Sequence, residues 1–175
     1  MGWTILIVVL AALVALYFYV NARPDAFRVE RRILINAPAE KIYPLVADFH
    51  QWTAWSPYEK LDPNLKRTYQ GSASGLGAIY AYEGNNKVGA GRMEVVEASA
   101  PTRLRTKLEF FKPMKAINLA EFDFLPRDNG TEVTWAMSGQ YNFMSKLFGT
   151  FMDFDKLVGG QFEEGLQNLK RTAEA

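Results

Sequence analysis

The pattern of hydrophobic and polar positions changes character along the chain. Residues 1–22 carry no charged side chain, and residues 5–20 (ILIVVLAALVALYFYV) are an unbroken apolar run. Residues 27–36 then alternate as a strand does, and the segment NAPAE that follows predicts a helix start, with a cap residue, an early proline and an acidic residue. Residues 50–56 predict a second short helix that ends at Pro57.

From residue 65 to residue 141 the hydrophobic residues recur with period two. Segments rich in Gly, Pro and Asn separate the candidate strands 65–70, 77–83, 90–98, 103–111, 116–125 and 132–141. Such spacing is typical of an antiparallel meander. Residues 144–173 return to helical spacing and predict one long helix, with an apolar stripe of Phe148, Phe151, Met152, Leu157, Val158, Phe162, Leu166 and Leu169. The order predicts an α+β fold, in which a seven-stranded antiparallel sheet curves around a long C-terminal helix.

The apolar N-terminal run has the length of a membrane span. Residues 2–20 as a helix extend over about 28 Å, and the hydrocarbon core of a bilayer is about 30 Å thick. We therefore expect a single-pass transmembrane anchor over residues 1–22, a linker over 23–26 and a folded domain over 27–175. A cleaved signal peptide and a buried soluble helix are the alternatives. Residues 20–22 resemble a cleavage site, although no positive residue precedes the run.

Arginines flank this run on one side only. Arg23, Arg28, Arg31 and Arg32 follow it, and no Lys or Arg precedes it. The excess of positive residues on the cytoplasmic side of membrane proteins then favours a cytoplasmic position for the domain.

Composition narrows the function classes. The 175 residues include 20 Lys and Arg, 19 Asp and Glu and no Cys, so the net charge is +1. A near-neutral chain is not expected to bind nucleic acid through a broad basic surface, and the lack of Cys excludes thiolate catalysis and Cys-ligated metals. With 12 Phe, 8 Tyr and 4 Trp, the domain has many aromatic side chains to place.

The parity of the predicted strands indicates which residues face inward, since successive side chains point to opposite faces of a sheet. Glu109, Glu121 and Asp123 fall on the outer face, as expected partners of Arg and Lys on neighbouring strands. A sheet that curves around one helix leaves a cleft with mostly apolar walls and few polar groups, which suits a hydrophobic ligand. The candidate ligand-binding residues are Trp52, Trp55, Tyr58, Tyr80, Tyr82, Met93, Thr106, Leu108, Phe110, Asn118, Phe122, Trp135, Met137, Phe151, Val158 and Phe162.

The aromatic residues between the short helix and the first meander strand admit two interpretations. Trp52, Trp55 and Tyr58 either pack in the core or form a wall or lid of the cleft, and different members can do each.

Catalytic motifs are not found. His50 is the only histidine, and the chain has no Gly-x-Ser-x-Gly elbow and no metal-ligand spacing. The sequence therefore predicts no catalytic residue, no metal and no cofactor. If the protein is instead an enzyme, the candidates for its general acid or base are Tyr80, Tyr82, Arg92 and Glu94.

Several motifs together resemble the SRPBCC superfamily, the START-like helix-grip domains often labelled polyketide cyclase/dehydrase. They span residues 27–172 and are INAPAEKIYPLVADF (35–49), WTAWSP (52–57), GLG (75–77), GAGRM (89–93), GTEVTW (130–135) and FEEGLQNLK (162–170). The resemblance implies a deep hydrophobic cavity between the sheet and the C-terminal helix, and members bind lipids, sterols or polyketides. It implies no catalytic residue, because the superfamily has none in common.

Two functions of different classes follow from this. The first is a membrane-anchored domain that binds a hydrophobic small molecule or lipid, without nucleic acid as a partner. The alternative is a cyclase or dehydratase that acts on an apolar, polyketide-like substrate.

Overall fold

The computed structural model describes residues 2–151 and 153–175, with the side chains of Phe148 and Phe151 left out. Its helices are α1 (Gly2–Asn21), α2 (Ala39–Ala47), α3 (Trp52–Trp55), α4 (Phe143–Phe151) and α5 (Phe154–Glu174), with the 3-10 helices η1 (Phe49–Gln51) and η2 (Pro57–Lys60). Its strands are β1 (Ala26–Ile35), β2 (Lys66–Gly71), β3 (Ala78–Glu83), β4 (Ala90–Ser99), β5 (Arg103–Lys112), β6 (Ala116–Arg127) and β7 (Gly130–Gln140).

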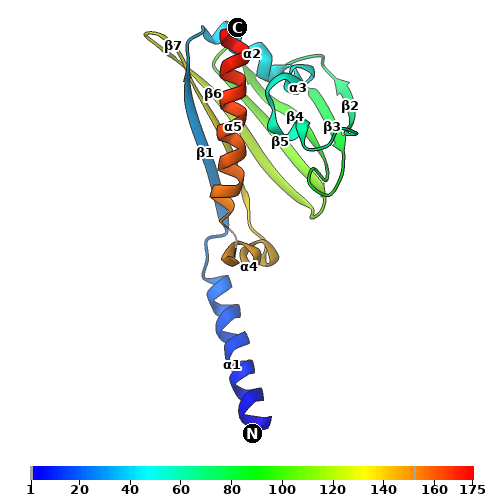
Figure 1. Cartoon of the computed structure of the whole chain (residues 1–175), viewed down its shortest axis with the longest axis vertical. Coiled ribbons are helices and arrows are strands. Elements are labelled where there is room, and N and C mark those ends of the chain that lie inside the picture. Colours follow the sequence, from blue (N-terminus) through cyan, green and yellow to red (C-terminus); the bar gives the residue numbers. More distant parts are fainter. Residues whose placement is uncertain (1, 152) are drawn as a thin grey trace.

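The strands form one antiparallel sheet in the order β1-β7-β6-β5-β4-β3-β2. The six strands from β2 to β7 make a meander, and β1 pairs with β7 at the end of the sheet, with Phe27 opposite Gly139 and Ile35 opposite Thr131. Figure 1 shows α5 running along this sheet beside β1, while α1 projects from the end of the domain that lies away from the C-terminus. The predicted fold class is confirmed.

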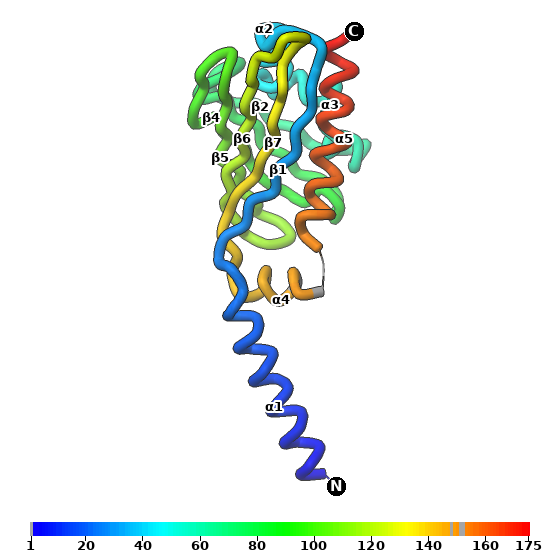
Figure 2. Tube along the Cα trace, turned by 90° about the vertical axis from the view of Figure 1, so that its left-hand side faces the viewer, coloured from blue at the N-terminus to red at the C-terminus, as the bar shows by residue number. Residues whose placement is uncertain are grey.

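Helix α5 covers the inner face of the sheet at β1 and β7, and the side view in Figure 2 shows it alongside β1. Arg31 of β1 donates from Nε to Glu163 at 2.7 Å and from Nη2 to Asp155 at 2.9 Å, so two ion pairs join the helix to the strand. Gly165 of α5 faces Trp135, and a Cβ there would lie 2.6 Å from the ring atom Cζ3. The glycine thus lets the helix approach the sheet closely.

The C-terminal segment is not one long helix, so that prediction is wrong. Asp153 has extended backbone angles (φ −77°, ψ 97°), and its carboxylate accepts a hydrogen bond from the Lys156 amide at 3.0 Å. An N-terminal cap of this kind begins a new helix. Helix α5 therefore covers the sheet without α4, which is a separate helix beside the end of α1 (Figure 1). Of the predicted stripe, Met152 and the side chains of Phe148 and Phe151 lie outside the described residues.

The outer face carries the charged side chains that the parity predicted. Arg103 pairs with Asp123 at 2.6 Å and Arg105 with Glu121 at 3.0 Å, both across β5 and β6. Across β4 and β5, Arg92 pairs with Glu109 at 3.2 Å and, within its own strand, with Glu94 at 2.8 Å. Arg92 and Glu94 therefore lie on the outer face, and neither fits the enzyme alternative.

Candidate functional site

The sheet register gathers most of the predicted inward residues into neighbouring rows on the face that α5 covers. Each row crosses the strands through residues that lie opposite one another. The rows are Tyr80–Met93–Leu108–Asn118, then Thr106–Ala120–Met137, then Phe122–Trp135, and at the other side Tyr82–Gly91–Phe110. Helix α5 adds Val158 and Phe162 above them. The predicted residues thus come from β3 to β7 and α5 to one surface.

One end of this surface is filled by aromatic rings. Trp52, Trp55, Phe122, Trp135 and Phe162 are each no more than 4% exposed. Phe122 stacks on Trp135 at 5.0 Å between ring centroids, and Trp135 stacks on Phe162 at 4.1 Å. The two indole N–H groups of the short helix α3 donate to the last turn of α2, each at 2.9 Å. At this end the core-packing interpretation holds for Trp52 and Trp55.

The other end, nearer α1, is less completely filled. Tyr58, Tyr82, Leu108, Phe110 and Val158 are only partly buried there. The hydroxyl of Tyr82 reaches across β4 over Gly91, where a Cβ would lie 2.5 Å from it. We refer to these five partly buried residues as the open half of the inner face.

Polar groups are few between the two halves. Thr106 Oγ1 and Trp135 Nε1 are buried and have no hydrogen-bond partner among the residues that the structure describes. Asn118 Nδ2 points to Met137 Sδ at 3.7 Å, and both side chains are buried. Buried polar groups usually have partners, so Thr106 Oγ1 and Trp135 Nε1 are exceptions within an otherwise apolar face.

The tyrosines of this face are held in the neutral form. Burial raises the pKa of Tyr82 to about 12. Burial also raises the pKa of Tyr58, with a smaller contribution from the neighbouring Tyr82. At neutral pH both side chains therefore present a hydroxyl that can donate a hydrogen bond.

The sequence analysis missed a buried carboxylate, Glu59 of η2. Tyr80 donates its hydroxyl hydrogen to Glu59 Oε1 at 2.5 Å, and Arg67 donates from Nε to Oε2 at 2.6 Å. Burial, and secondly the hydrogen bond to Glu59, raise the pKa of Tyr80. No periodicity marks Glu59, because η2 is a single turn that reaches Tyr80 only when it folds against β2 and β3.

His50 lies at the β2 edge of the inner face, beside Tyr69, which pairs with Tyr80. Its ring stacks on Tyr69 at 3.9 Å, and its Nδ1 lies 2.8 Å from Asp48 Oδ1, with a side chain that is 54% exposed. Within the described part of the chain, no three His, Asp or Glu side chains are grouped as metal ligands.

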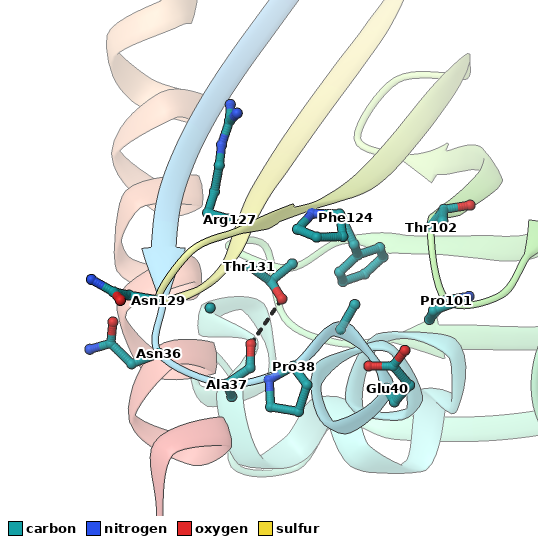
Figure 3. Close-up of a pocket in the computed structure, with 13 residues that line it drawn as sticks. Asn36, Ala37, Pro38, Glu40, Pro101, Thr102, Phe124, Arg127, Asn129 and Thr131 are labelled. Carbon is teal, nitrogen blue, oxygen red and sulfur yellow. Dashed lines mark hydrogen bonds between the residues drawn. The ribbon is translucent and has the colours of Figure 1, made fainter.

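Two hollows lie away from the five packed rings and from the open half of the inner face. One, of about 430 Å³, lies between the start of α2 and the hairpin of β6 and β7, where Thr131 Oγ1 donates to the Ala37 carbonyl at 2.8 Å (Figure 3). The other, of about 370 Å³, lies on β1, β5, β6 and β7 at the α1 end of the sheet, and Asn118 is the predicted residue that lines it. Phe151, the last predicted residue, has a side chain outside the described residues.

Comparisons with solved structures show the same fold at low sequence identity. A protein from Chromobacterium violaceum, CV1439, is 13% identical with a TM-score of 0.61, over 87% of this chain and 99% of that one. The Aha1 dimer structure from Colwellia psychrerythraea gives 18% identity and a TM-score of 0.60, over 85% and 96% of the two chains. The di-domain ARO/CYC protein BexL from the BE-7585A biosynthetic pathway gives 16% identity and a TM-score of 0.64, over 89% of this chain and 52% of BexL.

Sequence comparison identifies the family. No curated protein matches the chain. The family described as polyketide cyclase / dehydrase and lipid transport matches residues 26–174, which is the whole domain from β1 to the end of α5. The SRPBCC resemblance is thereby confirmed, and the chain belongs to the polyketide cyclase / dehydrase and lipid transport family.

Proposed function

We propose that this chain is a membrane-anchored module that binds a hydrophobic small molecule or lipid between the sheet and α5. The ligand contacts the open half of the inner face and extends toward Met93, Asn118 and Met137. The five packed rings, with Thr106 and Tyr80 beside them, form the inner end of the site.

The observation that carries this proposal is the unequal filling of one continuous apolar face. Five aromatic rings close one end, whereas Leu108, Phe110 and Val158 keep partly exposed apolar surface at the other. Exposed apolar surface inside a fold is unfavourable by about 25 cal/mol per Å², so an apolar occupant would stabilise the domain. The family description, which includes lipid transport, supports the same class of ligand.

Helix α1 supports the anchor. It is long and apolar enough to cross a membrane, and 6% of its apolar window is buried inside the protein. A core helix of a soluble protein would be mostly buried, so this one is better explained by lipid around it. A signal sequence passes the same test of length and composition, but Val20 at the end of α1 is fully buried and the ring of Tyr17 lies 5.7 Å from that of Phe143 of α4. These contacts favour a segment that stays with the mature domain.

Native mass spectrometry of the full chain, released from detergent micelles, tests the binding function. We expect an apolar molecule bound to the purified chain, or uptake of added palmitate. The variant Leu108→Trp fills the open half and should reduce the bound fraction at least several-fold. Its control, Val96→Trp, places the same ring on an exposed position of β4 and should retain the ligand. An empty chain that takes up no palmitate, or a Leu108→Trp variant that binds as well as the control, would contradict the proposal.

Glu59 favours a second candidate function, a cyclase or dehydratase that acts on an apolar substrate. It is a buried carboxylate hydrogen-bonded to Tyr80, and Tyr80 lies in the same row as Met93 and Leu108. A Glu59→Gln variant that binds the ligand normally but no longer converts a polyketide mimic would support this enzyme. Unchanged conversion in that variant would rule out Glu59 as its acid or base.

A further inference from the structure

Exposed apolar side chains gather at the α1 end of the domain. One end of the sheet contains the start of β1, the end of β7 and the turn between β5 and β6, since Ala26 pairs with Gln140 and Asn118 with Gly139. Helix α4 and the first turn of α5 lie next to that end (Figure 1). Large apolar residues that are between 42% and 64% exposed at this end are Phe111, Met114, Ile117, Phe143, Met144 and Leu157.

A buried lysine joins this apolar end to the segment that follows α1. Lys146 of α4 is 6% exposed, and its ammonium group donates to the Arg23 carbonyl at 2.9 Å and to the Asp25 carboxylate. Arg23 in turn donates to Thr150 Oγ1, and Tyr17 packs on Phe143 at 5.7 Å between ring centroids. The segment predicted as a linker is therefore bonded to α4, and it does not act as a free tether.

The length of α1 indicates the depth at which α4 lies relative to the bilayer. Helix α1 has 20 residues, and at about 1.5 Å per residue it spans about 30 Å, the thickness of the hydrocarbon core. Residues that follow Asn21 consequently lie at the level of the lipid headgroups. Because Lys146 holds α4 against residues 23 and 25, α4 lies at the same level.

We propose that the α1 end of the domain rests on the surface of the bilayer that α1 spans, with α4 and the β5–β6 turn as its two contacts. The inference depends on the proposed anchor. Phe143 and Met144 enter the interfacial region from α4, and Phe111 at the end of β5 and Met114 in the turn enter it from the other side. Lys115 of the turn and Lys112 at the end of β5 are exposed and suit anionic headgroups; Lys112 also pairs with Glu83 at 3.3 Å. The domain is thus held in one orientation, with the open half of the inner face nearest the lipid.

Site-specific fluorescence in liposomes tests this orientation. The chain contains no cysteine, so Met144→Cys and Met114→Cys each provide a single labelling site in the full chain. Leu76→Cys is the control, because Leu76 is also a well-exposed apolar residue but lies in the turn between β2 and β3, at the opposite end of the sheet. Each variant carries an NBD label in vesicles of phosphatidylcholine and phosphatidylglycerol. Nitroxide-labelled lipid and aqueous iodide are the two quenchers.

We expect nitroxide lipid to quench the labels at 144 and 114 and iodide to reach them several-fold less than the label at 76. Labels at 144 and 114 that are as accessible to iodide as the control, in a chain that resists alkaline carbonate extraction, would overturn this inference alone. Release of the chain by carbonate would overturn the anchor as well, while ligand binding is measured separately. In a Lys146→Met variant, shielding at 144 should fall while the chain stays inserted, and unchanged shielding would show that Lys146 does not hold α4.

Discussion

Trp135 of β7 and Phe162 of α5 stack face to face, with ring centroids 4.1 Å apart and planes 11° from parallel. This pair joins the helix to the sheet at the packed end of the inner face. Phe162→Ala removes a ring that is 2% exposed and leaves a cavity, so the free energy of unfolding should fall by about 3–5 kcal/mol. Chemical denaturation of the full chain in detergent measures it. Leu157→Ala, at a 56% exposed position of the same helix, should change it by less than about 0.5 kcal/mol.

Two glycines of α5 should respond to alanine with opposite sign. At Gly165 the new methyl group would lie 2.6 Å from Trp135 Cζ3 and 3.0 Å from Pro57 Cδ, so Gly165→Ala should destabilise the domain by about 1–3 kcal/mol. At Gly160 nothing lies within 4 Å, so Gly160→Ala should stabilise it by up to about 1 kcal/mol through helix propensity. Thermal unfolding compares the two variants. Equal effects of the same sign would mean that α5 does not approach the sheet at Gly165.

The hydrogen bond between Tyr80 and Glu59 should contribute measurably to stability. Tyr80→Phe keeps the ring but leaves a buried carboxylate oxygen without its donor, which typically costs about 1.5–3 kcal/mol. Tyr69→Phe is the matched control, because the Tyr69 ring stacks on Tyr80 at 5.3 Å and the substitution keeps that ring. Denaturant titration at neutral pH gives both values. A Tyr80→Phe loss no larger than that of the control would show that Glu59 does not depend on this hydroxyl.

Stability should fall in the alkaline range because of Tyr82. Its pKa is about 12 in the folded domain and about 10 in the unfolded chain. Below pH 10 both states keep the proton and the stability is complete. Between pH 10 and 12 only the unfolded chain releases it, so the free energy of unfolding decreases as the pH rises.

The variant Tyr82→Phe isolates this contribution. It should make the decrease shallower by one proton, or about 1.4 kcal/mol per pH unit, in denaturation series between pH 9 and 11.5. Identical slopes for the variant and the original chain would mean that Tyr82 ionises equally well in both states.

The strands could be predicted because their signal is local. Period-two alternation is a property of each strand, and it correctly placed Thr106 and Phe122 inside and Glu121 and Asp123 outside. Local pattern also predicted the apolar helix α1 and the order of the elements. Motif order indicated the family, which the match to residues 26–174 confirms.

Other features depended on contacts between residues far apart in the chain. Hydrophobic spacing runs on through Asp153, yet the capping hydrogen bond to Lys156 begins a new helix there, so the single long helix was wrong. Glu59 lies on one turn without periodicity and becomes a buried partner of Tyr80 only through the packing of η2. In the sequence, Lys146 looks like any solvent-exposed charge. In the structure it is buried because α4 packs against residues 23 and 25, to which Lys146 donates hydrogen bonds.

The local pattern of residues is enough to predict which faces of the strands are apolar, because side-chain direction alternates along an extended backbone whatever surrounds it. How that apolar face is filled depends on the folded arrangement of distant segments. Trp52, Trp55, Phe122, Trp135 and Phe162 come from α3, β6, β7 and α5, and their volumes fit together at one end and leave the other partly open. Packing of this kind depends on the distance between α5 and the sheet, which Gly165 and Arg31 set and which no local pattern encodes.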